Sequence, residues 1–320
     1  MLQAGRRTLH GLLLLAGVSL ISFVLLSIAP GNFYDELKLN PQISPETVAA
    51  LKLEYGMDRP LPVRYLRWVA SVGKGDFGYS LSYHCSVGSL LWPRARNTLL
   101  LTGLATLLAW MVAVPWGVLE ALHRGRWIDR TGGALTALLL AVPDVLLGLL
   151  FLLFAARTGW FPTGGMASMN AAGSALPARF QDLALHLFLP VLALGLGTIP
   201  VLVRHVRAAM VAALESPFME AAQGHGIHKW RLVYRHALPA AMNSLISLLG
   251  FSIGSLLSMS LLMEVVLGWP GLGPLTLEAM LARDVYVVMA AVTLSSVFLV
   301  AGNLIADALL YWNDPRIRAV

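Results

Sequence analysis

The chain has 320 residues, 57% hydrophobic and 12% charged, whereas soluble domains carry about 25% charged residues. This composition excludes an ordinary soluble domain and places the chain in a bilayer. The net charge of +6 does not indicate a nucleic-acid binder, because the basic residues are scattered in short segments between apolar runs. Cys85 is the single cysteine, which excludes an intrachain disulfide and a multi-cysteine metal site.

Six apolar runs are long enough to cross a membrane, which takes about 20 residues per helix. They cover residues 9–29, 97–119, 132–155, 186–206, 241–263 and 285–311. The sequence therefore predicts an all-α polytopic membrane protein with one transmembrane domain over 1–320. The first run follows two arginines, but its apolar core is longer than that of a signal peptide and no small-x-small cleavage site follows, so we expect an uncleaved span.

Lys and Arg indicate the orientation, because they concentrate in the cytoplasmic loops of membrane proteins. When six spans are threaded, most basic residues of the short segments fall on one side. They are Arg6, Arg7, Arg124, Arg126, Arg130, Arg204, Arg207, Lys229, Arg231, Arg235, Arg316 and Arg318. The opposite loops, 156–185 and 264–284, carry only Arg157, Arg179 and Arg283. We therefore expect both termini in the cytoplasm.

The segment 30–96 is predicted to be an extracytoplasmic helical insertion between the first and second spans. "SPETVAALKLEYGM" (44–57) has a Ser-Pro start and a Gly stop, which suits a short amphipathic helix. "DRPLPVRYLRWVASV" (58–72) indicates a turn into a second helix. Because the segment contains no paired carboxylates and no His cluster, we expect a packed cap or a docking surface rather than an enzyme domain.

Asp144 is the one ionisable residue expected well inside a predicted span. Such residues face a cavity or a partner, because a charge in hydrocarbon is costly. One interpretation is a pore-facing site for a substrate amine. The other is pairing with Ser, Thr or backbone of a neighbouring helix, which the adjacent Pro143 favours because proline frees a carbonyl and kinks a helix.

The segment 207–240, between the fourth and fifth spans, is the longest cytoplasmic connection. Ser216 and Pro217 suit the N-cap and first position of a short helix, with Glu220 near its positive end. Gly224 and Gly226 would end or turn that helix. A second helix is predicted with one apolar face, made of Trp230, Val233, Tyr234 and Ala237.

Two short helices across a glycine bend are suited to contact with a partner protein, but an amphipathic element on anionic headgroups has the same composition. The residues alone do not separate these alternatives. Three histidines occur between 225 and 236, yet their spacing across the bend defines no ligand face, so no metal site is expected.

Small residues mark the fifth span and the loop that follows it. Gly250 and Gly254 have the spacing of close helix packing, and Ser255 and Ser258 are candidates for the lining of a pore. "GWPGLG" (268–273) predicts a rigid turn outside this span. The candidate gate or docking residues in it are Trp269, suited to the aromatic belt, Pro270 and Gly271.

One motif resembles the EAA loop of ABC-importer permeases. The matching residues are Glu220, Ala221, Ala222, Gly226, Leu238 and Pro239. Further segments resemble the B-type permease of dipeptide, oligopeptide and nickel importers. These are "YGMDRPLPVRYLRW" (55–68), "GDFGYSLSY" (75–83), "RNTLLLTGLA" (96–105), "MEVVLGWPGLGPL" (263–275), "ARDVY" (282–286) and "DPRIR" (314–318).

This resemblance implies the fold of a type I ABC importer permease in the bacterial inner membrane. It implies a pore for peptides delivered by an extracytoplasmic solute-binding protein, built with a second homologous permease. The loop of each permease, including Trp230 on the second helix of this chain's loop, would dock into a cleft of one of two cytoplasmic ATPase subunits. ATP and Mg²⁺ would bind those partners, since this sequence has no phosphate-binding G-x-x-x-x-G-K-[ST]. We expect no cofactor and no enzymatic activity in this chain.

Two alternatives accompany this interpretation. Within the same family the solute could be a nickel chelate or another small molecule. From a different class, a secondary transporter would show inverted repeats and several buried ionisable residues along its spans. Asp144 alone does not meet that description.

Overall fold

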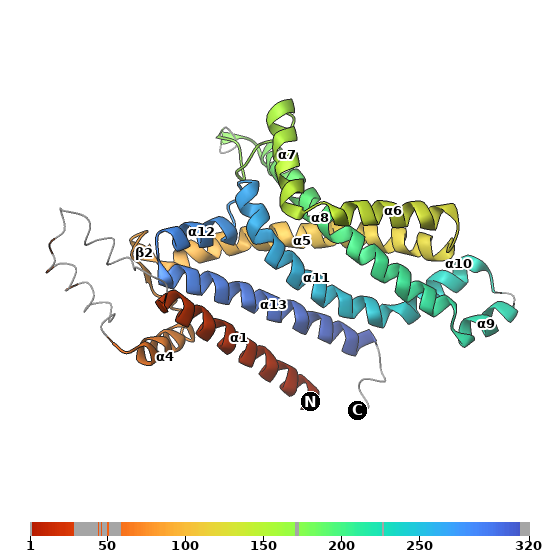
Figure 1. Cartoon of the computed structure of the whole chain (residues 1–320), viewed down its shortest axis with the longest axis horizontal. Helices are drawn as coiled ribbons and strands as arrows, with labels where there is room; N and C mark the ends of the chain where they lie inside the picture. Colours follow the sequence, from red (N-terminus) through yellow and green to blue (C-terminus); the bar gives the residue numbers. More distant parts are fainter. Residues whose placement is uncertain are drawn as a thin grey trace. The chain divides into compact units, whose positions relative to one another are not determined.

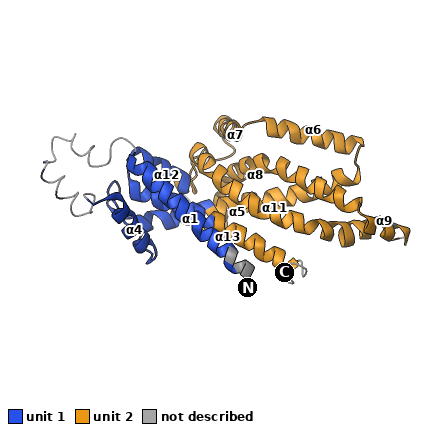
Figure 2. Ribbon diagram, turned by 60° about the horizontal axis from the view of Figure 1, so that its bottom comes forward, with its two compact units in different colours: residues 1–98, 270–298 blue, residues 99–269, 299–320 orange. Residues whose placement is uncertain are grey.

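The computed structural model describes residues 2–28, 44, 46, 50, 59–169, 173–225 and 227–313. The chain forms two compact units, residues 1–98 with 270–298 and residues 99–269 with 299–320 (Figure 2). Two long helices, α5 (Val87–Leu122) and α13 (Val285–Asn313), contribute residues to both units.

The first unit packs one apolar helix against a short amphipathic one. It contains α1 (Leu2–Ile28), α4 (Leu61–Val72), the two-residue strands β1 (Tyr79–Ser80) and β2 (Cys85–Ser86), and α12 (Leu272–Leu281). Phe23 of α1, Trp68 of α4 and Met289 of α13 form its buried cluster. The hydroxyls of Ser19 and Tyr65 lie 2.9 Å apart and join α1 to α4. Helix α4 confirms the helix predicted after 58–60, whereas the predicted helix at 44–57 lies largely outside the described residues.

The antiparallel strand pair and α12 are elements that the sequence pattern does not predict. Strands of two residues are too short for an alternating pattern, and Ser80 pairs with Cys85 only because the turn between them closes. Helix α12 is ten residues long. It is too short to cross a membrane, which is why a search for spans leaves it in a loop.

The second unit is helical throughout its described secondary structure. Its elements are α6 (Trp127–Ala141), α7 (Asp144–Thr158), α8 (Leu176–Leu214), α9 (Pro217–Gly224), α10 (Lys229–Leu232), the π-helix η2 (Val233–Ala237) and α11 (Leu238–Val266). Small residues of α5 let α8 approach it: Ala109 and Ala113 are fully buried beside α8. A Cβ added at Gly117 would lie 2.8 Å from Val206.

The predicted third span, residues 132–155, is broken between α6 and α7, at the position where Pro143 indicates a kink in the sequence. The two helices are bent by 88° (Figure 1). Pro143 forces the residue before it out of helical geometry, and Val142 is accordingly extended at φ −88° and ψ 120°. Within the described residues, five further helices are long and apolar enough to span a membrane, and the bent pair counted as one gives the six spans predicted.

Candidate functional site

Helix α9 carries the Glu-Ala-Ala motif on a face turned away from the protein. Met219 is fully buried, whereas Glu220 and Ala221 are exposed and Ala222 is half-buried. Helix α9 begins at Pro217, directly after Ser216, as predicted, but the Ser216 hydroxyl does not cap the helix and donates back to the carbonyl of Ala213 at 2.5 Å. The turn is closed instead by the backbone N–H of Met219, which donates to the Ser216 carbonyl at 2.9 Å.

The second half of this loop is held by an apolar base. Leu232, Val233 and Ala237 are buried in one cluster with Met219 and with residues of α5 and α8. The spacing of these three positions follows from a π-helical turn, in which the N–H of Leu238 donates to the carbonyl of Val233, five residues back. Single π-turns occur often at functional sites in helices.

The predicted apolar face of the second helix is wrong in two of its four members. Trp230 and Tyr234 are 56% and 59% exposed, while Val233 and Ala237 are buried. Residues at α-helical spacing along α10 and η2 are thus divided between a buried side and an exposed side. The two exposed rings stack on each other, with centroids 5.8 Å apart and planes 14° from parallel.

The remaining loop residues lie at its two ends. Leu238 is half-buried against the apolar base, and Pro239 is exposed at the second position of α11. Gly226 lies outside the described residues. At the start of the loop, Glu215 forms an exposed ion pair with Arg124 of the α5–α6 connection.

Figure 1 shows α9 and α10 projecting beyond the ends of α8 and α11, the two long helices that the loop joins. The loop thus combines an outward surface of one acid, small residues and two stacked aromatic rings with a buried attachment to α5 and α8. Such a surface can enter a partner's cleft and transmit force to the helices that carry it.

Asp144 begins α7 at the helix break and lies against α8. A Cβ at Gly197 would collide with its carboxylate, so the glycine makes room for the acid. The carboxylate is half-buried, and it makes no hydrogen bond or ion pair with another residue of the described chain. The described part therefore offers no Ser or Thr partner for Asp144.

Two buried acids near the ends of the long helices α5 and α11 were also missed by prediction from the sequence. Glu120 and Glu264 each follow a predicted span by one residue, and they are 1% and 0% exposed. The helices α5 and α11 continue past those limits. The prediction that only Asp144 lies inside a span is therefore wrong, and the missed signal is an acid with apolar residues on both sides.

The glycines of α11 confirm the predicted close packing. A Cβ at Gly250 would lie 2.9 Å from the Cβ of Ala306 in α13, and one at Gly254 would collide with Leu299. Ser255 and Ser258 donate to carbonyls of their own helix, those of Ser252 and Gly254. Ser255 is half-buried and Ser258 exposed.

Trp269 does not stand in an aromatic belt. Its side chain is fully buried in a cluster with Leu101 of α5 and Leu194 of α8, which corrects the exposed position predicted for it. The preceding Gly268 has φ +63°, a conformation that favours glycine, and a Cβ added to it would lie 3.2 Å from the Cα of Gly164.

Pro270 and Gly271 belong to the first unit, where side chains of α5 hold the turn. The amide of Asn97 donates to the carbonyl of Pro270 at 2.7 Å, and the N–H of Leu272 donates to the hydroxyl of Thr98 at 2.9 Å. Asn97 is part of "RNTLLLTGLA", so that motif and the turn form one hydrogen-bonded structure.

A buried acid organises the end of α12. The carboxylate of Asp284 accepts from the Ser80 hydroxyl at 2.6 Å, the Ser82 N–H at 3.2 Å and the Val287 N–H at 3.3 Å. It thereby joins "GDFGYSLSY" to "ARDVY". Nearby, the Tyr83 hydroxyl donates to Glu278 at 2.8 Å. Partial burial and this acceptor raise the pKa of Tyr83 to about 12.

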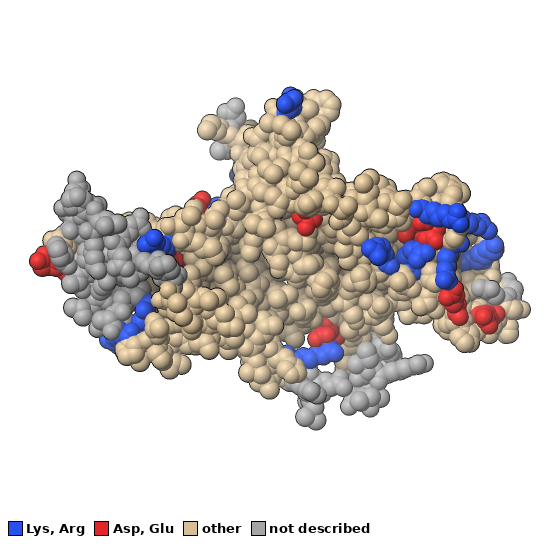
Figure 3. All heavy atoms as spheres, in the orientation of Figure 1, with Lys and Arg blue, Asp and Glu red and all other residues tan. Residues whose placement is uncertain are grey.

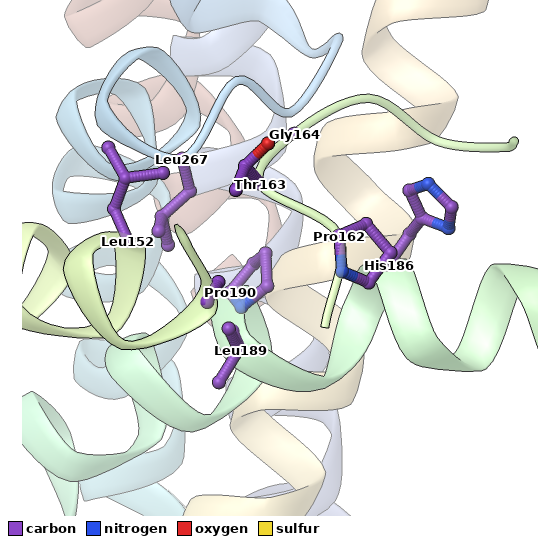
Figure 4. Close-up of a pocket in the computed structure, with 9 residues that line it drawn as sticks. Leu152, Pro162, Thr163, Gly164, His186, Leu189, Pro190 and Leu267 are labelled. Atoms are coloured by element: carbon purple, nitrogen blue, oxygen red, sulfur yellow. The ribbon is translucent and has the colours of Figure 1, made fainter. Parts of the chain in front are cut away.

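The small cavity in Figure 4 is not a substrate chamber. It lies among α7, α8 and the loop around Thr163, has a volume of about 10 Å³, and includes Pro190 and His186 in its lining. A volume of that size holds about one water molecule. His186 is satisfied there by a contact of 2.8 Å between its Nδ1 and the carbonyl of Asp182.

Family models and individual relatives assign the chain to the same protein family. Residues 113–319 match the family described as "Binding-protein-dependent transport system inner membrane component", and residues 1–100 match its N-terminal companion family. The chain is 35% identical to the oligopeptide transport system permease protein AppB of Bacillus subtilis over 98% of each chain. It is 31% identical to the dipeptide transport system permease protein DppB of Escherichia coli over 94% of each.

A third relative and a solved structure extend this likeness. The glutathione transport system permease protein GsiC of Salmonella paratyphi A is 31% identical over 94% of both chains. A chain of the inward-facing MetNI methionine ABC transporter matches with a TM-score of 0.52 and 22% identity, over 68% of this chain and 95% of that one. The structural match shows a shared fold.

Proposed function

The chain belongs to the family of binding-protein-dependent transport system inner membrane components, and we propose that it is the pore-forming permease subunit of an ABC importer for di- or oligopeptides. It is a multi-pass inner-membrane protein. A binding protein on the outer side delivers the solute, a second homologous permease completes the pore, and two cytoplasmic ATPase subunits supply the energy. Both termini lie in the cytoplasm. Peptides are favoured because the relatives named above include oligopeptide and dipeptide permeases.

The loop from α9 to η2 is the observation that carries this proposal. Its outward surface presents Glu220, Ala221 and the Trp230–Tyr234 stack to the ATPase subunit. The buried base of Met219 and Val233 fixes the loop to α5 and α8. When ATP closes the ATPase dimer, each cleft moves its loop as a rigid lever, and α8 and α11 tilt to open the pore to the other side. We expect Gly226, which lies outside the described residues, to supply the bend between the two short helices.

This chain itself has no ATPase site and no cofactor in the proposed importer. ATP and Mg²⁺ bind the partner subunits, and hydrolysis reaches the pore only through the loop. The pore lies between the two permeases. Ser255, Ser258 and Asp144 are the candidates of this chain for its lining, and Trp269, Pro270 and Gly271 form a rigid external turn beside it.

The first experiment is co-purification of the chain with its native partners in mild detergent. We expect wild type to retain the ATPases and the second permease. Glu220→Lys should lose the ATPases and keep the second permease, because it reverses the charge at the tip of the loop. The matched control is Glu278→Lys, the same change at an exposed acid of α12. If wild type purifies alone and Glu220→Lys alters only lipid binding, the loop is a membrane-surface element and the proposal is wrong.

Two further measurements test whether the loop couples ATP hydrolysis to transport and which class of solute is transported. Gly226→Asp should leave the complex assembled but uncouple ATP hydrolysis from transport, so full transport by this variant contradicts the role of the bend. In proteoliposomes, peptide-loaded binding protein should stimulate ATP hydrolysis more than a nickel chelate does. The opposite order would favour the other solute class of the same family.

A further inference from the structure

A polar cavity lies among α5, α6 and α8, near the cytoplasmic end proposed for these helices. Its volume is about 360 Å³, equivalent to about twelve water molecules at liquid density. The residues that line it are Glu120, Asp129, Arg130, Gly133, Thr136, Ala137, Arg204 and Arg207. In Figure 3, Lys and Arg gather around a patch of Asp and Glu at the end where Figure 1 places α10 and the start of α6.

The charged groups on the inner side of the cavity already contact one another. Arg207 of α8 donates from Nε and Nη2 to the two carboxylate oxygens of Asp129 in α6, at 2.6 and 2.8 Å. The carboxylate of Glu120 in α5 lies 4.0 Å from the same guanidinium. Glu120 is 1% exposed, and a Cβ at Gly132 would collide with it. One arginine and two acids therefore make a fixed structural cluster.

The outer side of the cavity carries two arginines that, unlike Arg207, form no ion pair within the described part of the chain. Arg130 of α6 and Arg204 of α8 both line the cavity and both are exposed. Neither guanidinium makes an ion pair or hydrogen bond with any residue in the described part of the chain. The lining thus has three guanidinium groups against two carboxylates. Its two unpaired guanidinium groups come from different helices and border the same cavity, and guanidinium groups are suited to bind phosphate.

The surface beside the cavity has the character of a membrane boundary. Trp127, at the start of α6, is 73% exposed, as expected of an indole at the headgroup level. Further along the same helix, Leu135 and Leu138 are exposed and offer an apolar surface to acyl chains. Arg130 lies between the indole and these leucines in the sequence. Guanidinium groups beside such a helix are better suited to bind a lipid headgroup than a soluble anion.

We propose that this cavity binds the headgroup phosphate of an acidic phospholipid of the cytoplasmic leaflet, held between Arg130 and Arg204, with its acyl chains along α6. The net positive lining favours acidic over zwitterionic headgroups. The bound lipid would bridge α6 and α8, and α8 leads directly into the loop from α9 to η2. The site is a property of this chain in a membrane and does not depend on which solute is transported.

The test is a lipid titration of the purified importer complex by native mass spectrometry, with phosphatidylglycerol as the probe. The test variant is Arg130→Gln with Arg204→Gln. The control variant is Arg126→Gln with Arg179→Gln, which removes the same charge from two exposed arginines that do not line the cavity. Since each basic residue near an anionic surface contributes a factor of about five, we expect the test pair to weaken binding about thirtyfold. The control should stay within about twofold.

A steric variant keeps the proposal testable if the double substitution impairs assembly. Gly133 lines the cavity, and a Cβ there meets no other atom within 4 Å. Gly133→Leu should therefore fill the site without a clash and lower phosphatidylglycerol retention at unchanged charge. Equal binding by all variants overturns the proposal. It is also overturned if inorganic phosphate at equal concentration displaces the lipid, or if a partner subunit protects α6 from hydrogen exchange with and without phosphatidylglycerol.

Discussion

The loop from α9 to η2 and the segment from Pro270 to Asp284, which contains α12, both connect long apolar helices. They differ in where their polar and aromatic side chains point. The α9–η2 loop leaves Glu220 and the Trp230–Tyr234 stack facing outward. The other segment directs Asp284 inward onto the β1–β2 turn. The α9–η2 loop therefore leaves groups available for a partner protein, whereas the segment from Pro270 to Asp284 satisfies its buried acid within the chain.

The largest effect is expected from a charge placed in the base of the loop. Val233→Asp buries an unpaired carboxylate, which costs several kcal/mol and should unfold the loop. Tyr234→Asp, at the neighbouring exposed position, should keep the loop folded and weaken only ATPase association. Limited proteolysis distinguishes them. Equal protease resistance of the two variants would show that the division into base and outward face is wrong.

A large effect is also expected in the inward-facing acid. Asp284→Ala leaves the Ser80 hydroxyl and the N–H groups of Ser82 and Val287 without their acceptor. We expect a loss of about 3 kcal/mol in stability, seen as a lower apparent melting temperature in detergent. Glu278→Ala is the control, because it removes one hydrogen bond at the surface. An equal decrease for both variants would count against a rigid turn organised by Asp284.

An intermediate effect is expected at the exposed rings. Trp230→Ala removes half of the stack and should raise the dissociation constant for the ATPase subunits about thirtyfold, as for an aromatic residue at the centre of an interface. Lys229→Ala, its exposed neighbour, should change this constant less than about threefold. Surface-immobilised complex in nanodiscs provides the measurement. Similar constants for both variants would place the interface elsewhere on the loop.

The smallest effect concerns the hydrogen bond from Tyr83 to Glu278. The pKa of Tyr83 is about 12 in the folded protein, above the ordinary value of about 10. The folded state therefore favours the protonated phenol. Its contribution is fully present below a pH of about 10 and is lost as the pH rises towards about 12. The difference in melting temperature between wild type and Tyr83→Phe should be constant from about pH 7 to about pH 9 and shrink above about pH 10. A difference that already falls below pH 9 would contradict this assignment.

The amino-acid sequence by itself determined the membrane class, the number of spans and the position of the loop. These features depend on local composition: a run of about 20 apolar residues has few alternatives in a bilayer. The small residues Gly250 and Gly254 were also sufficient to predict close packing, because only a missing side chain allows the contact with Ala306 and Leu299. Family motifs added the order of segments along the chain.

Only the tertiary structure decided which side chains of those segments face outward. Trp230 and Tyr234 have the spacing of a buried face, but they are exposed, while Val233 and Ala237 of the π-turn are buried. Trp269 has the composition of an interfacial residue, yet it is buried by α5 and α8. Asp284, Arg130 and Arg204 acquire their roles from partners, or from the lack of partners, on distant segments. Local periodicity cannot contain this information, because burial and pairing depend on which helices meet in space.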